Sequence, residues 1–247
     1  EVVLAPDRWK ADVVAEELAD AGKVWVHPYD RRGTVEGAGT VGREIAEDWP
    51  DVDVVVLCVG GGGLSSGSAL ALRRALGERV VLLGAEPTGA ATMQAAQRAG
   101  ESVHLDEITS EVQGLTTTFA GVLNVAVCRA TLDGILTVDD EAILAAQRRL
   151  VNDDEEAGWV AEIVEPAGAA AYAAVLDADF CDLVSAARER RGLPSDPSRA
   201  LRVAVTISGG PSQARIPPAM SRSPIRWLVW PSAEAMGSST ARPPASV

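Results

Sequence analysis

Lysine is almost missing from this sequence. The chain of 247 residues contains two lysines, Lys10 and Lys23. Lys10 falls on the exposed side of an amphipathic segment, and Lys23 directly follows Gly22, where that segment ends. We interpret both as solvated surface charges. The sequence therefore offers no amine that looks buried and available for covalent catalysis.

Cysteine is also scarce. The three cysteines, Cys58, Cys128 and Cys181, lie far apart in the chain. Their spacing matches no metal-binding pattern, and an odd number of distant cysteines is typical of proteins in a reducing cytosol. We expect three inert thiols that pack in the core.

Long apolar runs and excess positive charge are missing as well. No apolar run reaches the roughly 18 residues of a membrane-spanning helix, and Glu1-Val2-Val3 lack the basic and apolar parts of a secretory signal. The formal net charge of −13 argues against nucleic acid and anionic membrane surfaces as partners. We therefore expect a cytoplasmic protein without nucleic acid or membrane partners.

Four consecutive glycines, Gly60 to Gly63, are the most informative feature that is present. They follow an apolar run at residues 52–59 and precede a segment at 64–76 that has a helical pattern. A buried strand that ends at a glycine turn and leads into a helix leaves several backbone N–H groups free. Those donors and the positive end of the helix dipole form an anion site, for which phosphate is the usual ligand.

Strand-like and helix-like segments alternate along the chain. This order predicts an α/β fold, an open and mostly parallel sheet with helices on both faces, which binds ligands at the carboxyl ends of its strands. The expected strands are residues 2–4, 24–27, 52–59, 80–84, 135–138, 159–164 and 201–207. The expected helices are residues 6–21, 40–49, 64–76, 88–100, 122–131, 141–151 and 166–176, and residues 28–37 are expected to be a polar loop.

Known phosphate-binding patterns separate the candidate ligands. A nucleotide-binding P-loop needs Gly-Lys-Ser/Thr at the end of its glycine loop, and Leu64 follows Gly63 here, which excludes it. A dinucleotide site needs Gly-x-Gly-x-x-Gly, and the last glycine falls on Ser65 or Ser66. Glu86 after the next strand still resembles the acidic ribose ligand of such a site, so a NAD-dependent oxidoreductase stays open. A plain turn without a ligand explains four glycines poorly, because they cost backbone entropy.

Seven short motifs, in the same order, resemble the serine/threonine dehydratases and serine racemases of the tryptophan-synthase-β-like fold (pyridoxal-phosphate fold type II). The resemblance covers residues 2–211, and its most specific part is Gly60-Gly61-Gly62-Gly63-Leu64. The other six segments are His27-Pro28-Tyr29-Asp30, residues 36–45, Gly84-Ala85-Glu86-Pro87, residues 134–141, Glu165-Pro166-Ala167-Gly168-Ala169-Ala170 and Ser208-Gly209-Gly210.

The resemblance implies pyridoxal 5'-phosphate as the cofactor. Backbone N–H groups of Gly60, Gly61, Gly62, Gly63 and Leu64 would hold its phosphate. Gly114 and Glu165 would lie beside the ring, and the Ser208 hydroxyl would bind the pyridine nitrogen.

A divalent cation is a further implication of the resemblance. Glu86 helps to bind one in several relatives, and such sites need several oxygen ligands. The relatives' second carboxylate, six residues on, is Thr92 here, so the motif is incomplete.

The family's catalytic lysine has no counterpart in this chain. It belongs to a Ser-x-Lys-x-Arg segment near the N-terminus of the relatives, and no such segment exists here. We therefore expect that the chain starts part-way through a longer protein. Residues 1–39 would be the trailing part of a small domain, 40–215 a large cofactor-binding domain, and 216–247 a poorly ordered tail in which Trp227 to Trp230 could dock.

The activity that the resemblance implies is dehydration and deamination of L-threonine or L-serine to a 2-oxo acid and ammonia. We expect that the chain alone is inactive, and the residues present do not separate a dehydratase from a racemase. Relatives are often dimers, so a homodimer is compatible with this assignment. A non-catalytic cofactor- or anion-binding remnant stays open as an alternative.

Overall fold

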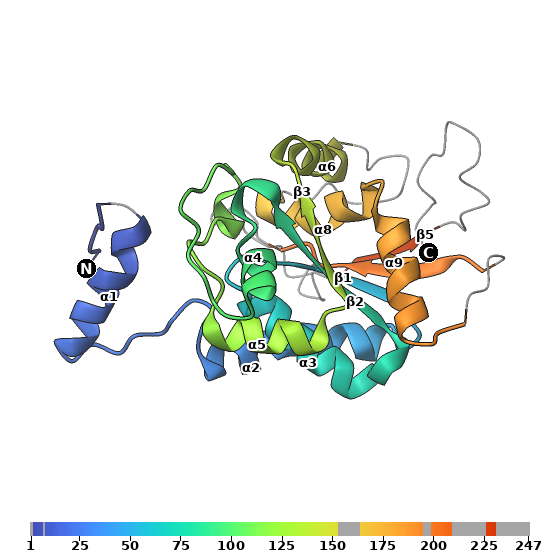
Figure 1. Cartoon of the computed structure of the whole chain (residues 1–247), viewed down its shortest axis with the longest axis horizontal. Coiled ribbons are helices and arrows are strands. Elements are labelled where there is room, and N and C mark those ends of the chain that lie inside the picture. Colours follow the sequence, from blue (N-terminus) through green and yellow to red (C-terminus); the bar gives the residue numbers. More distant parts are fainter. Residues whose placement is uncertain (1, 7, 153–163, 195–198, 209–225, 231–247) are drawn as a thin grey trace, which may run out of the picture.

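A five-stranded sheet forms the centre of the protein, with the strand order β3-β2-β1-β4-β5 (Figure 1). The computed structural model describes residues 2–6, 8–152, 164–194, 199–208 and 226–230. The first four strands along the chain are parallel, and β5 pairs antiparallel with β4 at the edge. This confirms the expected open, mostly parallel sheet. The strands are β1 (Val54–Cys58), β2 (Val81–Pro87), β3 (Gly134–Val138), β4 (Leu201–Val205) and β5 (Arg226–Trp230).

The central strand β1 is buried on both faces. Val55 and Leu57 belong to one apolar cluster, while Val54, Val56 and Cys58 belong to a second cluster on the other face. Because successive strand residues point to opposite faces, a strand covered on both sides reads as a continuous apolar run. This is why the run at residues 52–59 predicts a central strand correctly.

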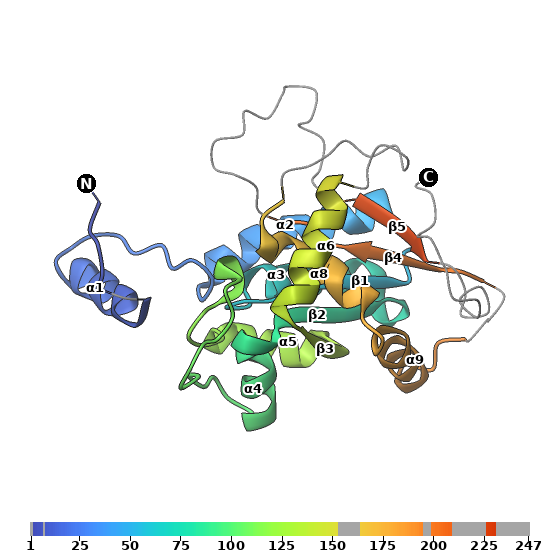
Figure 2. The ribbon, with the colours of Figure 1, turned by 90° about the horizontal axis from the view of Figure 1, so that it is seen from above.

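Helices cover both faces of the sheet (Figures 1 and 2). Helices α2 (Arg32–Asp48), α3 (Gly63–Leu76) and α5 (Val122–Thr131) form one layer, and α4 (Thr92–Ala99) packs against α5. The layer on the opposite face consists of α6 (Asp140–Asn152), α8 (Pro166–Leu176) and α9 (Phe180–Arg190). Short 3-10 turns lie at Gly77–Arg79, Thr88–Ala90 and Gln113–Leu115. Among the described helices, none combines the length and apolarity that crossing a bilayer requires.

Helix α2 begins earlier than the sequence predicts. The expected helix starts at residue 40 after a polar loop, whereas α2 starts at Arg32 and includes Gly33, Gly37 and Gly39. Glycine lowers helix propensity, which is why the sequence favours a loop here. Close packing against α3 requires a small residue at Gly42 and leaves little room at Gly39, where a Cβ would lie 3.3 Å from the carbonyl oxygen of Gly67, whereas a Cβ on Gly33 or Gly37 would meet nothing within 4 Å. The expected domain boundary between residues 39 and 40 lies inside this helix, and the division of the chain there stays a prediction.

Two expected strands are wrong. Residues 2–4 and 24–27 are extended segments without strand pairing, on either side of α1 (Arg8–Asp20). Val2 and Leu4 are each 86% exposed, and Val24 is 90% exposed. Their short runs of apolar, mostly β-branched residues favour strands, but a strand forms only when another strand accepts its hydrogen bonds. Figure 1 shows this arm and α1 standing away from the sheet.

Other differences lie in the second half of the chain. Helix α9 is missing from the sequence-based prediction, although Phe180, Val184 and Ala187 are buried at helical spacing. The strand expected at residues 159–164 falls largely outside the described residues. Within the segment 216–247, which we expect to be poorly ordered, the structure differs at Arg226–Trp230, where β5 pairs with β4.

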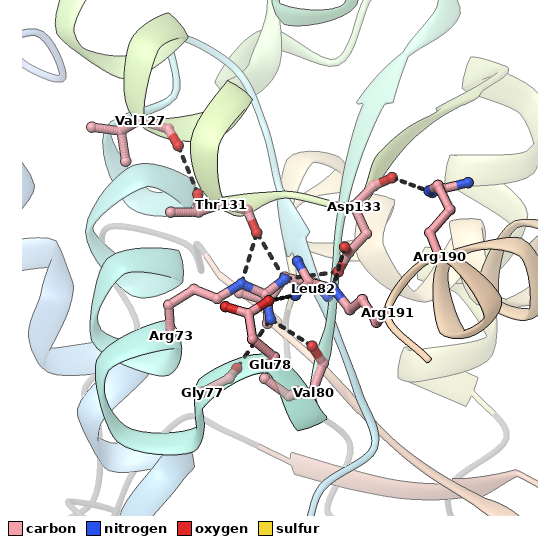
Figure 3. Close-up of polar contacts among 10 residues, drawn as sticks. All are labelled: Arg73, Gly77, Glu78, Val80, Leu82, Val127, Thr131, Asp133, Arg190 and Arg191. Atoms are coloured by element: carbon pink, nitrogen blue, oxygen red, sulfur yellow. Dashed lines mark hydrogen bonds and ion pairs between the residues drawn. The ribbon is translucent and has the colours of Figure 1, made fainter. Parts of the chain in front are cut away.

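A buried ion-pair network ties the sheet to both helical layers (Figure 3). Arg73 on α3 pairs with Asp133 at a distance of 2.8 Å, and their side chains are only 11% and 7% exposed. The Arg73 guanidinium also donates to the carbonyl oxygens of Thr131, Gly77 and Val80.

Asp133 lies just before β3 and joins this network to β2 and α9. Its carboxylate accepts the N–H of Leu82 at 2.8 Å and pairs with Arg191, which also contacts Glu78. Burial raises the pKa of Asp133, while the Leu82 N–H and Arg73 act in the opposite direction. The network links α3, β2, β3 and α9, and removal of one partner would leave a buried charge uncompensated at this junction.

Candidate cofactor site

The tetraglycine segment lies where the strand order reverses. Strand β1 has β2 on one side and β4 on the other, and the chain leaves β1 through Gly60, Gly61 and Gly62 into α3. In open α/β sheets, the carboxyl ends of strands at such a reversal are the usual ligand site. Gly62 is the N-cap of α3, with φ 93° and ψ 1°.

Three carbonyl groups of this segment are bound on the protein side. The Gly61 oxygen accepts the N–H of Gly121 at 3.0 Å, and the Gly62 oxygen accepts the N–H of Ser66 at 2.9 Å. The Gly60 oxygen lies 3.5 Å from the Thr92 hydroxyl, which donates to it. In a trans peptide, the C=O of one residue and the N–H of the next point in opposite directions. The N–H groups of Gly61, Gly62 and Gly63 therefore point away from these partners.

The amides of the segment are available to a ligand. Among the described residues, none accepts a hydrogen bond from the backbone N–H of Gly60, Gly61, Gly62, Gly63 or Leu64. The first N–H groups of a helix have no partner inside it, and the helix dipole adds positive potential at the same point. The result is a cradle of main-chain donors that suits a phosphate.

Glycine is required in the cradle because other groups approach it closely. A Cβ built on Gly61 would clash with ring carbons of Tyr29. A Cβ built on Gly62 would lie 2.6 Å from Met93 Cε and 2.8 Å from Asn124 Cβ. Its φ of 93° also belongs to the left-handed region, which other residues rarely adopt.

Gly114 and Glu165 lie beside the cradle. A Cβ built on Gly60 would be 3.5 Å from the carbonyl oxygen of Gly114. A Cβ built on Gly114 would be 3.2 Å from the carboxylate Oε1 of Glu165, which is exposed before α8. Gly60, Gly114 and Glu165 thus form a continuous surface.

Ser208 follows β4, which pairs with β1 on the edge opposite to β2. It is half-buried, and its carbonyl oxygen packs so closely on Gly168 of α8 that a Cβ there would clash with it. The Cys58 thiol at the end of β1 faces Ser208 and Thr206, and burial raises the pKa of this thiol. The described structure therefore brings the ends of β1 and β4 together, with Ser208 near the strand that carries the cradle.

A family model described as pyridoxal-phosphate dependent enzyme matches residues 1–189. The chain belongs to this family. The donors in the cradle fit the phosphate of its cofactor, pyridoxal phosphate, because they are main-chain N–H groups at a helix N-terminus. The chain is also similar to serine racemases and threonine dehydratases.

Two curated relatives illustrate this similarity. A serine racemase of Oryza sativa subsp. indica is 35% identical over 161 residues, which are 65% of this chain and 45% of the relative. A biosynthetic L-threonine dehydratase of Mycobacterium tuberculosis (strain ATCC 25618 / H37Rv) is 37% identical over 175 residues, 69% of this chain and 39% of the relative. The chain thus spans less than half the length of either relative.

Solved structures of the pyridoxal-phosphate dependent enzymes share the fold. Maize serine racemase matches with a TM-score of 0.65 and 30% identity, over 81% of this chain and 57% of that one. A threonine deaminase of T.th. matches with a TM-score of 0.64 and 29% identity, over 84% of this chain and 63% of that one.

Glu86, the predicted cation ligand, caps a helix in this member of the family. It is fully buried, and its two carboxylate oxygens accept the N–H groups of Met93 (3.0 Å) and Gln94 (2.8 Å) at the start of α4. Burial raises the pKa of Glu86 to about 7, although these two N–H groups lower it. In the described part of the chain, no three His, Cys, Asp or Glu side chains are grouped to hold a metal ion. The cation stays a prediction and would need carbonyl or water ligands.

The two lysines lie on the arm that precedes α2. Lys10 is on α1 and Lys23 follows it, and both are exposed. Figure 1 shows α1 away from the sheet that carries the cradle. This placement agrees with their interpretation as surface charges.

Asp30 and Asn124 hold the cradle in place, but the sequence-based prediction includes Asp30 in a motif without assigning it a role and does not single out Asn124. The Asp30 carboxylate accepts the N–H groups of Val122 and Leu123 at the start of α5. The Asn124 side chain is fully buried and contacts the tetraglycine segment. The only sequence signal for Asn124 is a polar residue on the same helical stripe as Cys128 and Thr131, which are also buried.

Proposed function

We propose that the chain supplies the cofactor-binding part of a pyridoxal-phosphate dependent ammonia-lyase. The enzyme would dehydrate and deaminate L-threonine or L-serine to a 2-oxo acid and ammonia. The observation that carries the proposal is the cradle at Gly60–Gly63, whose carbonyl groups are bound by the protein while its N–H groups have no partner among the described residues.

Each predicted site residue has a proposed role. The N–H groups of Gly60 to Leu64 would bind the phosphate, and Gly114 and Glu165 would border the ring. When bound, pyridoxal phosphate withdraws electrons from the Cα of an amino acid and weakens the bonds there. The Ser208 hydroxyl would bind the ring nitrogen, and unlike a carboxylate it does not force that nitrogen to carry a proton. A weaker electron sink of this kind suits elimination better than transamination.

We also propose that this chain alone does not turn over substrate. Lys10 and Lys23 are exposed on the arm, and the family's chemistry needs a lysine beside the cofactor. The chain would bind the cofactor without a covalent bond, through the phosphate. We further propose a cytoplasmic protein with amino-acid substrates, without nucleic acid or membrane partners, that can form a homodimer. Residues 40–215 would be its large domain.

A titration with pyridoxal 5'-phosphate tests the first step. We expect saturable binding that is much weaker for pyridoxal, which has no phosphate. Reduction with borohydride followed by mass spectrometry should find no specific adduct at Lys10 or Lys23. Assays for ammonia and 2-oxo acid from threonine should stay at background. A specific lysine adduct together with turnover of threonine would contradict the proposed inactivity.

Binding of NAD in place of pyridoxal phosphate is the outcome that would favour a different function. The segment after Gly61 lacks the third glycine of the dinucleotide pattern. Tight and specific NAD binding, with no preference for pyridoxal phosphate over pyridoxal, would contradict the proposed lyase function and indicate a NAD-dependent oxidoreductase. Binding of pyridoxal phosphate, sulfate and phosphate with similar affinities would favour a non-catalytic anion-binding protein.

Serine racemisation is the second candidate, because serine racemases are among the similar proteins. The same weakening of bonds at Cα supports proton exchange when the β-hydroxyl stays in place. A longer gene product that contains a Ser-x-Lys-x-Arg segment would separate the two activities. D-serine as the main product from L-serine indicates a racemase, and a 2-oxo acid with ammonia indicates a lyase.

A further inference from the structure

The segment His27-Pro28-Tyr29-Asp30 packs directly against the tetraglycine cradle. A Cβ built on Gly63 would lie 2.9 Å from Tyr29 Cα, and one built on Gly61 would clash with the Tyr29 ring. The ring of Tyr29 also makes an edge contact with Phe119, at 5.5 Å between centroids. Segments that are distant in the chain therefore form one packed unit.

His27 fixes the shape of this turn. Its Nδ1 accepts the N–H groups of Tyr29 (3.2 Å) and Asp30 (2.9 Å), and its carbonyl oxygen accepts the hydroxyl of Thr34 at 2.9 Å. The His27 side chain is buried, and this burial lowers its pKa. A neutral imidazole can keep accepting these two N–H groups.

Asp30 connects the turn to helix α5. Its two carboxylate oxygens accept the N–H groups of Val122 (3.0 Å) and Leu123 (3.1 Å). The N-cap residue of α5 is Gly121, which has no side chain to perform this role. A carboxylate at a helix N-terminus satisfies free donors and interacts favourably with the helix dipole.

Asn124 completes the link between α5 and the cradle. Its Nδ2 donates to the carbonyl oxygens of Tyr29 (3.0 Å) and Gly61 (2.9 Å). Both neighbours are acceptors, so the amide nitrogen and not the oxygen must face them. The side chain is fully buried, which holds this orientation against competition from water.

We propose that Tyr29, Asp30 and Asn124 are positioning residues, and we name them the loop clamp. They hold the tetraglycine segment so that its N–H groups face the ligand. The clamp binds the Gly61 carbonyl toward α5, so the N–H of the same peptide, on Gly62, points to the ligand. The Tyr29 ring packs directly against Gly61. Asp30 fixes α5, and through it the position of Asn124. The inference rests on the proposed function, because it assigns the ligand as a phosphate.

Four variants test the clamp. Asn124→Leu keeps the side-chain size and removes both hydrogen bonds, and Tyr29→Ala removes the ring. Tyr29→Phe is the matched control for the second variant, because the contacts to the cradle involve ring carbons. Thr131→Val is the matched control for the first: it removes another buried polar group from α5, whose hydroxyl donates to Val127.

The measurement is the ratio of the dissociation constants of pyridoxal and pyridoxal 5'-phosphate. This ratio isolates the contribution of the phosphate, and a general loss of packing does not lower it selectively. We expect it to fall at least tenfold in Asn124→Leu and Tyr29→Ala and to change less than twofold in both controls. Folding of each variant is checked by circular dichroism. If Asn124→Leu does not fold, Tyr29→Ala decides.

A second readout needs no cofactor. In protein labelled with 15N-glycine, the amide signals of Gly61, Gly62 and Gly63 should shift in Asn124→Leu and Tyr29→Ala but not in the controls. If the wild type fails to prefer pyridoxal phosphate over pyridoxal, the proposed function fails, and these signals still test the clamp. Wild-type signals and a wild-type ratio in folded Asn124→Leu or Tyr29→Ala would overturn the clamp itself.

Discussion

Gly42 on α2 faces Ser68 on α3 so closely that a Cβ built on Gly42 would lie 2.7 Å from the Ser68 Cα. The same crossing brings Gly67 of α3 to Gly39 of α2, where a Cβ on Gly67 would lie 2.7 Å from the Gly39 nitrogen. The two backbones are therefore in direct contact. This contact fixes α3, whose first two residues, Gly63 and Leu64, supply the last donors of the cradle.

Gly67→Ala should destabilise the protein because the added methyl group has no room between the two backbones. Overpacking of this kind costs about 1–3 kcal/mol. Gly37→Ala is the matched control in the same helix pair, since a Cβ there meets nothing within 4 Å. Replacing this helical glycine should stabilise the protein by about 0.5–1 kcal/mol. Urea unfolding of both variants measures the difference, and equal effects at the two sites would refute the close crossing.

Gly62→Ala should abolish the preference for pyridoxal phosphate over pyridoxal. An alanine here would be strained in the left-handed region, and its Cβ would clash with Asn124 Cβ. Both effects would change the direction of the cradle's N–H groups. Gly100→Ala is the control, because Gly100 has a similar backbone (φ 82°, ψ 0°) and its Cβ would meet only the end of Arg129, at 3.3 Å. It should cost about 1–2 kcal/mol of stability and leave cofactor affinity unchanged. Retained phosphate preference in folded Gly62→Ala would argue against the cradle.

Asp133→Ala should lower the free energy of unfolding by about 3–5 kcal/mol, because it leaves Arg73 buried without its charge partner. Glu36→Gln is a control that breaks an exposed ion pair with Arg32. The side chains of Arg32 and Glu36 are 88% and 61% exposed. Such pairs contribute about 0–1 kcal/mol. Chemical denaturation compares the two variants. A loss below about 1 kcal/mol for Asp133→Ala would mean that the network relaxes or admits water.

Glu86 should make stability depend on pH. Its folded pKa of about 7 lies above the ordinary value of 4.5 because burial disfavours the charged form. The protonated acid therefore stabilises the fold fully below pH 4.5, and this contribution is lost as the pH rises through 7. Relative to Glu86→Gln, the wild type should lose up to about 3 kcal/mol between about pH 4.5 and pH 8, at roughly 1.36 kcal/mol per pKa unit.

The same pair of proteins tests the predicted cation. If Mg²⁺ or Ca²⁺ binds at Glu86, millimolar concentrations should raise the melting temperature of the wild type at about pH 8 and leave Glu86→Gln unchanged. An equal response of both proteins would remove Glu86 as a ligand. In the pH experiment described above, an identical pH dependence of stability in the wild type and Glu86→Gln would show that Glu86 does not titrate between about pH 4.5 and pH 8.

Most elements that bury apolar residues were predictable from the sequence, and α9 is the exception. The expected helices at 122–131 and 166–176 have the bounds of α5 and α8, and the apolar runs predict β1, β2 and β4. Periodicity and apolar runs report burial, which decides these elements. The two strands expected at residues 2–4 and 24–27 are wrong because pairing depends on a partner strand that no local pattern can reveal.

The cradle was predictable for a different reason. Four glycines between a strand and a helix have a direct meaning for main-chain geometry. The loop clamp was not predictable, because Asn124 and Gly61 are 63 positions apart and only the packing of α5 brings them together. Asp30 acts on α5 across a separation of 92 positions. Tertiary contacts of this length leave no periodic trace in the sequence.

The exposed segments on either side of α1 should determine whether the chain self-associates in solution. Val2, Leu4, Val24 and Val26 present apolar side chains on extended backbone whose amides are not paired within the described structure. Backbone of this kind readily joins that of a neighbouring molecule. Concentrated samples of the isolated chain should therefore self-associate, and dilute or detergent-containing buffers should keep it monodisperse for the binding experiments.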